Sequence, residues 1–319
     1  MWLILSLIGL GHAAKSVGWV YVADPTQQRW EGLAFEAMDL MVVGPLGLQQ
    51  CDWTPHRQSV FPYRPLFNCE ASFGVNASFL DRFEHLLALA RQRNPNLEVM
   101  AAQWYASDWE APLESWGGSL GVYGPDIASE QLEGYASTVS AFLHRYNLTG
   151  YVLDYEGTNV LRWYPELLRQ LLRVFRDRSG PHRLGVSPST AQHLRGTNHL
   201  TDFVFLQSYT PGVDLQEYLD IFDASKVFLG MCRFGCDAHG SLPSAAREVQ
   251  AKHLAGIHLW RLNDGDEGRM AEENELMRKV RTHLTPLGRR RRAELPSGFF
   301  NLVDAFPAAS APTNWSGEK

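Results

Sequence analysis

The sequence predicts an α/β domain of the (β/α)8 TIM-barrel class, because eight short apolar runs alternate with amphipathic stretches along 319 residues. Alternating strands and helices favour parallel strand pairing with right-handed crossovers, and this length suffices for one such barrel. An open doubly wound sheet is the alternative, although no G-x-G-x-x-G turn follows the first run. The expected strands are Gly18–Val22, Leu40–Val43, Leu97–Ala102, Gly150–Asp154, Arg183–Val186, Phe203–Gln207, Lys226–Met231 and Gly256–Trp260.

The segments between these strands carry the three- and four-residue spacing of apolar side chains that predicts amphipathic helices. Ser129 stands just before one such pattern, where an N-cap is expected. Residues 44–72 are instead rich in proline and aromatic residues and predict an insertion after the second strand, at the end of the barrel where loops shape active sites. The expected helices are Phe79–Arg93, Ser129–Tyr146, Trp163–Phe175, Leu215–Phe222, Ala245–His253 and Arg269–His283.

Both ends of the chain are expected to lie outside the barrel, which then spans residues 15–286. Residues 1–14 join an apolar run to small residues, a pattern typical of a secretory signal peptide and too short for a membrane span; a buried first strand is the alternative. Residues 287–319 contain the run Arg289–Arg292 and predict a solvated basic, proline-rich tail, with a protease processing site as the alternative. We therefore expect a soluble monomer that is secreted or lumenal.

Composition narrows the range of partners. A formal net charge of −6 provides no basic surface for nucleic acid. Ten Trp and eleven Tyr suit the faces of sugar rings, because their side chains pair an apolar body with a polar edge, although any large domain also buries aromatic residues. His182, His193 and His199 lack the spacing of metal ligands, so neither a metal nor another cofactor is expected.

Four cysteines suit an exported chain with two local disulfides. Cys51 lies near Cys69 and Cys232 near Cys236 along the chain, but the sequence leaves all three pairings open. Neither spacing is the C-x-x-C of a zinc knuckle. Three sequons mark acceptor sites for N-glycans in a host that adds them, at Asn76, Asn147 and Asn314.

The candidate chemistry lies at the end of the fourth expected strand, which runs into Asp154 and Glu156. Side chains alternate along a strand, so these two carboxylates should point the same way, into the mouth of the barrel. Two carboxylates placed together favour one protonated and one charged group, and a glycosidic oxygen needs an acid to leave. A glycoside hydrolase is therefore predicted; a solvated strand end is the alternative.

Around these residues the chain resembles glycoside hydrolase family 18, the chitinase family. The family's D-G-x-D-x-D-x-E motif aligns with Thr149–Glu156, so that Gly150, Asp154 and Glu156 match. Gln207-Ser208-Tyr209 resembles the family's Q-x-Y on strand six, and Trp260 matches the Trp that ends strand eight. The chain departs from the motif at Thr149 and Val152, and Ala101–Trp104 stands where the family has S-x-G-G.

The resemblance implies retaining hydrolysis of N-acetylhexosamine linkages, with the substrate's own acetamido oxygen as nucleophile. Glu156 would be the acid and base, while Asp154 would orient the acetamido group and offset the developing positive charge. Tyr209 and Gln207 would contact the acetamido group, and Trp260 would form the floor under the sugar.

Trp104 follows the third expected strand, and we expect it to stack on a sugar at the mouth of the barrel, with loop packing as the alternative. With Val152 in place of the inner Asp of the motif, Asp154 lacks a carboxyl partner, and we expect activity with a shifted pH optimum. A hyaluronidase-like hydrolase and a catalytically inactive glycan-binding relative remain alternative functions. The predicted partner is an oligosaccharide or polysaccharide.

Overall fold

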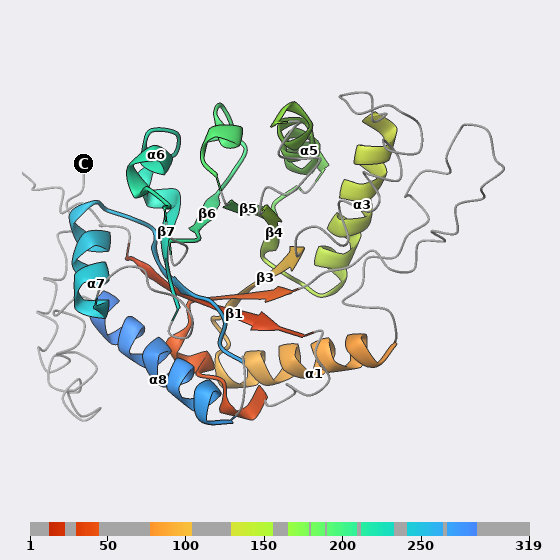
Figure 1. Cartoon of the computed structure of the whole chain (residues 1–319). Helices are drawn as coiled ribbons and strands as arrows, with labels where there is room; N and C mark the ends of the chain where they lie inside the picture. The colour runs from red at the N-terminus through yellow and green to blue at the C-terminus, as the bar shows by residue number, and fades with distance from the viewer. Residues whose placement is uncertain are drawn as a thin grey trace, which may run out of the picture. The chain divides into compact units, whose positions relative to one another are not determined.

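The computed structural model describes residues 13–22, 30–44, 77–103, 129–155, 165–178, 180–188, 190–208, 212–232, 241–263 and 267–285. Eight parallel strands form a closed barrel in chain order, β1 to β8, and the helices lie around its outside (Figure 1). The predicted barrel is confirmed, and the open sheet is wrong. The strands are β1 Lys15–Tyr21, β2 Leu40–Gly44, β3 Glu98–Gln103, β4 Gly150–Tyr155, β5 Arg183–Pro188, β6 Phe203–Leu206, β7 Val227–Met231 and β8 Gly256–Leu259.

All of the described residues except Thr285 belong to one compact unit. Within it, none of the described helices combines the length and apolar character that a membrane crossing requires. The helices are α1 Ala77–Arg93, α3 Ser129–Arg145, α5 Pro165–Arg178, α6 Leu215–Leu219, α7 Leu242–Ala251 and α8 Glu267–Leu284, and the 3-10 helices are η1 Trp30–Gly32, η2 Phe35–Ala37, η4 Gln192–Leu194 and η5 Ala224–Lys226.

The largest difference from the expected strands is at β1, which begins at Lys15 instead of Gly18. Lys15 and Ser16 are polar, so their side chains give no strand signal, yet both pair with β8 and close the barrel. The buried Ser16 hydroxyl lies 2.7 Å from the Ala37 carbonyl oxygen and 3.0 Å from Asp39 Oδ2. These partners satisfy the hydroxyl and make a polar residue tolerable inside a strand.

Helix α7 begins three residues earlier than predicted, at Leu242. Ser241 is its N-cap and a proline lies in its first turn, both of which favour helix initiation ahead of the apolar pattern. Helix α6 is shorter than predicted and ends at Leu219, where Asp220 follows as the C-cap.

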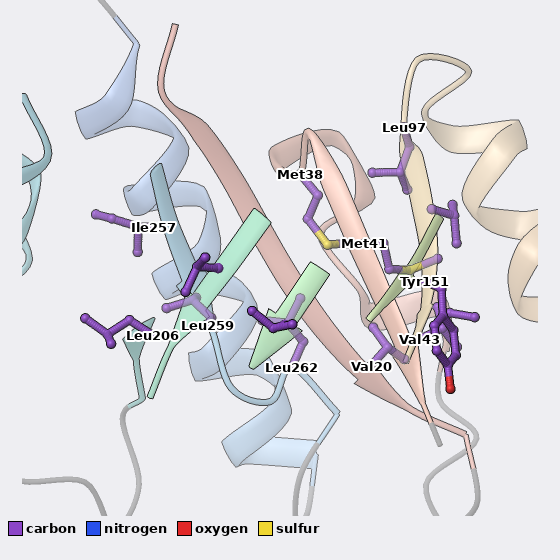
Figure 2. Close-up of a cluster of buried hydrophobic side chains, with 14 of the residues drawn as sticks. Val20, Met38, Met41, Val43, Leu97, Tyr151, Leu206, Ile257, Leu259 and Leu262 are labelled. Atoms are coloured by element: carbon purple, nitrogen blue, oxygen red, sulfur yellow. The ribbon is translucent and has the colours of Figure 1, made fainter. Parts of the chain in front are cut away.

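The apolar side chains form two clusters, one on each side of the barrel wall. The larger cluster lies between the strands and the helices and includes Val20, Met41, Ile257 and Leu262 (Figure 2). The smaller cluster fills the interior of the barrel and includes Trp19, Val152, Phe205 and Phe228. A strand that is buried on both faces reads as a continuous apolar run, which explains why the strands were recognisable in the sequence.

A charged cluster covers the end of the barrel at which the strands begin. Glu98 Oε2 accepts hydrogen bonds from Lys15 Nζ at 2.7 Å and Arg183 Nη1 at 3.0 Å. Both cations also lie over the ring of Phe203, at 5.7 and 5.3 Å from its centroid. The interior of the barrel is therefore sealed here, and the site must be sought where the strands end.

Several predictions concern residues outside the described ranges. These are residues 1–12 of the expected signal peptide, the tail, the insertion beyond Gly44, and Cys51, Cys69 and Cys236. Cys232, the fourth, directly follows β7. The disulfide pairing and the boundaries of the domain remain predictions.

Candidate active site

A buried polar cluster lies at the carboxyl ends of β4, β5 and β6. Asp154 is the last inward-facing residue of β4, and its side chain is buried, with 6% of the residue exposed. The register of β4 with β5 places Ser187 beside it. Gln207 follows β6 directly and reaches both neighbours, since its Nε2 donates to Asp154 Oδ1 at 3.1 Å and to Ser187 Oγ at 3.2 Å. The carboxylate is thus held by a neutral amide, which fixes its direction without adding charge.

Aromatic side chains form the side of the site contributed by β1 and β8. The ring of Trp260, which follows β8, meets the ring of Trp19 from β1 edge-on at 5.3 Å between centroids. Trp19 in turn packs edge-on against Phe205 at 5.5 Å. Such edge-to-face contacts favour a fixed orientation of the rings, so the buried Trp19 supports the partly buried Trp260. The peptide bond that follows Trp260 is cis.

Asp154 from the polar cluster and the rings of Trp19 and Trp260 line one pocket, whose empty space of about 230 Å3 includes open solvent. Asp154 lies on its wall, and the two Trp rings supply broad apolar surfaces. The pocket is lined by Trp19, Val20, Tyr21, Gly44, Ala102, Asp154 and Trp260.

The end of β1 that enters this pocket is fixed by a side-chain clamp. Asn263 accepts a hydrogen bond from the Tyr21 backbone N–H at 2.8 Å and donates one to the Tyr21 carbonyl oxygen at 2.6 Å. The Arg261 guanidinium lies 5.0 Å from the centroid of the Tyr21 ring. The segment that carries Trp260 is therefore tied to the end of β1 at Tyr21.

The layer directly beneath the polar cluster is apolar. Counting back two residues along each strand leads from Asp154 to Val152, from Ser187 to Gly185 and from Gln207 to Phe205. A Cβ on Gly185 would lie 2.9 Å from Phe205 Cε2 and 3.2 Å from Val152 Cγ2, so these three positions meet inside the barrel. Val152, one of the two residues at which the chain differs from the family motif, is therefore part of a closely packed layer.

His258 lies deeper in the barrel, on β8, and is fully buried. Its ring lies 5.6 Å from that of Phe205 and 6.1 Å from that of Trp19. Burial lowers the pKa of His258 to about 4, although a hydrogen bond from Nε2 to the Leu206 carbonyl oxygen, at 2.9 Å, opposes this shift. The imidazole is therefore neutral at physiological pH and contributes no charge below the pocket.

The structure brings together three of the site residues predicted from the sequence: Asp154, Gln207 and Trp260. Glu156, Tyr209 and Trp104 lie outside the described residues, so their place in the site remains a prediction. Nowhere in the described ranges do three or more His, Cys, Asp or Glu side chains gather as metal ligands would.

Two residues of the site were not recognised in the sequence, Trp19 and Ser187. Trp19 occupies an inward position of a predicted strand, whereas Ser187 lies one residue beyond the predicted end of the fifth strand, because β5 continues to Pro188. The β4–β5 pairing, which sets Ser187 beside Asp154, is the signal that sequence reasoning lacked.

Comparison with known proteins identifies the class to which this fold belongs. No protein-family model matches the chain, and no curated protein matches it in sequence. Solved structures of chitinases do match. One is the family 18 chitinase ChiB of Flavobacterium johnsoniae, at 13% identity and a TM-score of 0.55, covering 86% of this chain and 95% of that one.

Two further structures extend the comparison to other kingdoms. The Group IV chitinase of Ostrinia furnacalis has 12% identity and a TM-score of 0.58, covering 85% of this chain and 99% of that one. A plant class V chitinase mutant of Cycas revoluta, in complex with (GlcNAc)3, has 11% identity and a TM-score of 0.59, with the same shares covered. The chain thus has the fold of glycoside hydrolase family 18 chitinases, as the sequence motifs indicated.

Proposed function

We propose that the chain is a retaining glycoside hydrolase that cleaves N-acetylhexosamine linkages, like a chitinase or an endo-N-acetylglucosaminidase. The observation that carries this proposal is Asp154, a buried carboxylate held by Gln207 on the wall of a pocket that Trp260 also lines. A ring stacked on Trp260 would present its 2-acetamido group to the polar cluster. Similarity to a chitinase structure in complex with (GlcNAc)3 supports this class of substrate.

In the proposed reaction, Glu156 gives its proton to the glycosidic oxygen while the acetamido oxygen attacks the anomeric carbon, which breaks the bond and forms an oxazolinium ion. Asp154 accepts the acetamido N–H and stabilises the positive charge that develops on this group. Water then opens the ion from the same face on which the leaving group departed, and Glu156 takes the proton. The configuration at the anomeric carbon is therefore retained.

The proposal is tested by incubating the purified chain with N-acetylglucosamine oligomers, chitin and a high-mannose glycopeptide from acid to neutral pH. We expect hydrolysis of at least one of these, with loss of about 1000-fold in kcat in Glu156→Gln, since the amide has nearly the same shape but cannot give a proton to the leaving oxygen. Asp154→Asn should lose about 100-fold, because the amide presents a donor to the acetamido N–H. Exposed Glu275→Gln on α8 is the matched control and should keep full activity.

The two alternative functions give different results in the same experiment. Hyaluronan is added as a fourth substrate, and its cleavage with none of the other three cut supports the hyaluronidase-like alternative. Binding of an oligomer without hydrolysis by the parent, and unchanged binding in Glu156→Gln, supports the glycan-binding alternative. Either result overturns the proposed activity.

We also propose that the chain acts as an exported monomer. Asn147, in the sequon Asn147-Leu148-Thr149, is exposed in the turn before β4 and has a φ of 49°, a backbone conformation that asparagine adopts more readily than most residues. This turn lies where β4 begins, at the opposite end of the strand from Asp154. A glycan there would leave the pocket open.

A further inference from the structure

Ser208 stands at the position that the Q-x-Y motif leaves open, and the proposed reaction gives it no role. It follows β6 closely and is 1% exposed. Its Oγ donates a hydrogen bond to the Gly230 carbonyl oxygen at 2.9 Å and accepts one from the Gly230 N–H at 2.8 Å. One side-chain atom thus binds both backbone polar groups of a single residue on β7.

These two bonds continue the pairing of β6 with β7 beyond the end of β6. The register pairs Leu206 with Leu229, and β6 ends there, whereas β7 continues to Met231. Along a strand, successive residues direct their backbone groups alternately to the two neighbouring strands. The Met231 carbonyl oxygen faces the β8 side, where it accepts the Trp260 N–H, so the buried backbone groups of Gly230 face β6. Buried backbone groups need partners, and the serine hydroxyl supplies them.

The same bonds join the polar and the aromatic halves of the site. Gln207, the residue before Ser208, holds the carboxylate of Asp154 at 3.1 Å. On β7, Met231 accepts the N–H of Trp260 at 3.1 Å through its carbonyl oxygen. At the level of the site, β6 and β7 are therefore joined through this hydroxyl. A sugar ring stacked on Trp260 reaches the carboxylate only while the two halves keep their separation.

We propose that Ser208 is a positioning residue, whose hydroxyl sets the distance between Trp260 and the pair formed by Gln207 and Asp154. It acts through the backbone of β6 and β7 and does not touch the substrate. This inference rests on the proposed function for its kinetic consequence. Its structural consequence, a junction between two strands that depends on one hydroxyl, is independent of any activity.

The structural experiment is hydrogen exchange at the Gly230 amide, followed by NMR on the purified chain. In the parent this N–H should be strongly protected, because it is buried and donates to Ser208 Oγ. In Ser208→Ala it should exchange at least about tenfold faster, while the amide of Phe228, earlier on β7, keeps its parental rate. Fast exchange in the parent, or an unchanged rate in the variant, overturns the proposal.

The kinetic experiment uses an N-acetylglucosamine oligomer as substrate. Ser208→Ala should lower kcat by about tenfold and change KM by less than about twofold, because the stacking surface of Trp260 remains while its alignment with Asp154 is lost. Ser208→Thr keeps the hydroxyl and should retain at least about half of the parental kcat. If the threonine variant is as slow as the alanine variant, the hydroxyl does not set the alignment, and the proposal is overturned.

A double-mutant cycle with Trp260→Ala tests the coupling between the two halves of the site. Without the indole ring, the distance from this ring to Asp154 no longer matters. Ser208→Ala should therefore lower kcat by less than about threefold in the Trp260→Ala background. A serine with a merely structural role would give losses that multiply, and that result would refute positioning by Ser208.

The matched control is Ser16→Ala at the opposite end of the barrel. Ser16 is also a buried serine with hydrogen-bonded partners, so this variant loses a comparable hydroxyl without touching the site. It should lower stability and leave kcat unchanged. A fall in kcat equal to that of Ser208→Ala would mean that stability explains the effect, and the proposal would fail. If the parent hydrolyses no substrate, the proposed function fails, and hydrogen exchange alone decides the role of Ser208.

Discussion

His258 makes the stability of the barrel depend on pH, and the size of the effect follows from its burial. Its pKa is lowered to about 4 in the folded chain, because burial disfavours the imidazolium, whereas an unfolded chain has the ordinary value of about 6.5. Between these two values the unfolded state binds a proton that the folded state does not. Stability is therefore complete above about pH 6.5 and is lost as the pH falls toward 4.

The expected loss is roughly 3 kcal/mol, since each unit of difference in pKa corresponds to about 1.36 kcal/mol. Urea unfolding at pH 7.5 and pH 4.5, followed by Trp fluorescence, measures most of it. His258→Gln keeps an N–H donor for the Leu206 carbonyl oxygen but does not titrate. We expect the difference in unfolding free energy between the two pH values to be about 2–3 kcal/mol smaller in this variant than in the parent.

The exposed His199 supplies the control, because His199→Gln should leave the pH dependence as it is in the parent. Carboxylates also take up protons in this range, but they do so equally in parent and variants. If the parent and His258→Gln lose the same stability between pH 7.5 and 4.5, His258 is not held neutral by the fold, and the reasoning from its burial is refuted.

Three other predictions concern the pocket, the layer beneath it and the surface. Trp260→Ala should raise KM by about tenfold through loss of the stacking surface, while Trp30→Phe, a buried change away from the pocket, should not. Val152→Asp should lower the unfolding free energy by about 4 kcal/mol, because it buries a carboxyl group among apolar atoms. This loss should be larger than the loss in Val152→Ala, and equal losses in urea unfolding would contradict the prediction. Asn147→Gln should remove one glycan from the chain secreted by a eukaryotic host, seen by mass spectrometry before and after deglycosylation; an unchanged mass would show Asn147 to be unmodified.

The barrel could be predicted from the sequence because strands buried on both faces appear as uninterrupted apolar runs. All eight expected strands are present, and the errors lie at their ends. At Lys15 and Ser16 polar side chains continue a strand, since Glu98 and Asp39 supply their partners from β3 and from the residue before β2. Those partners are distant in the chain, so a local reading of β1 could not have included them.

The candidate site could be predicted only where a residue resembles a known motif. Asp154, Gln207 and Trp260 match such motifs, and the structure brings them to the same end of the barrel. Trp19 and Ser187 match none. They enter the site through closure of the barrel, which brings β1 to β8, and through the register of β4 with β5. Register is set by how two strands pair, so it cannot be deduced from the sequence of either strand alone.

The apolar layer beneath the site accounts for how Asp154 is held. A carboxylate that is almost buried needs partners, and charged partners are costly to bury alongside it. Two positions below the polar cluster, Val152, Gly185 and Phe205 have no polar side-chain atom that could bind the carboxylate. The partner that the structure describes for Asp154 lies instead at the same level of the barrel. Gln207 supplies it without adding charge, and the same amide nitrogen also lies 3.2 Å from Ser187 Oγ.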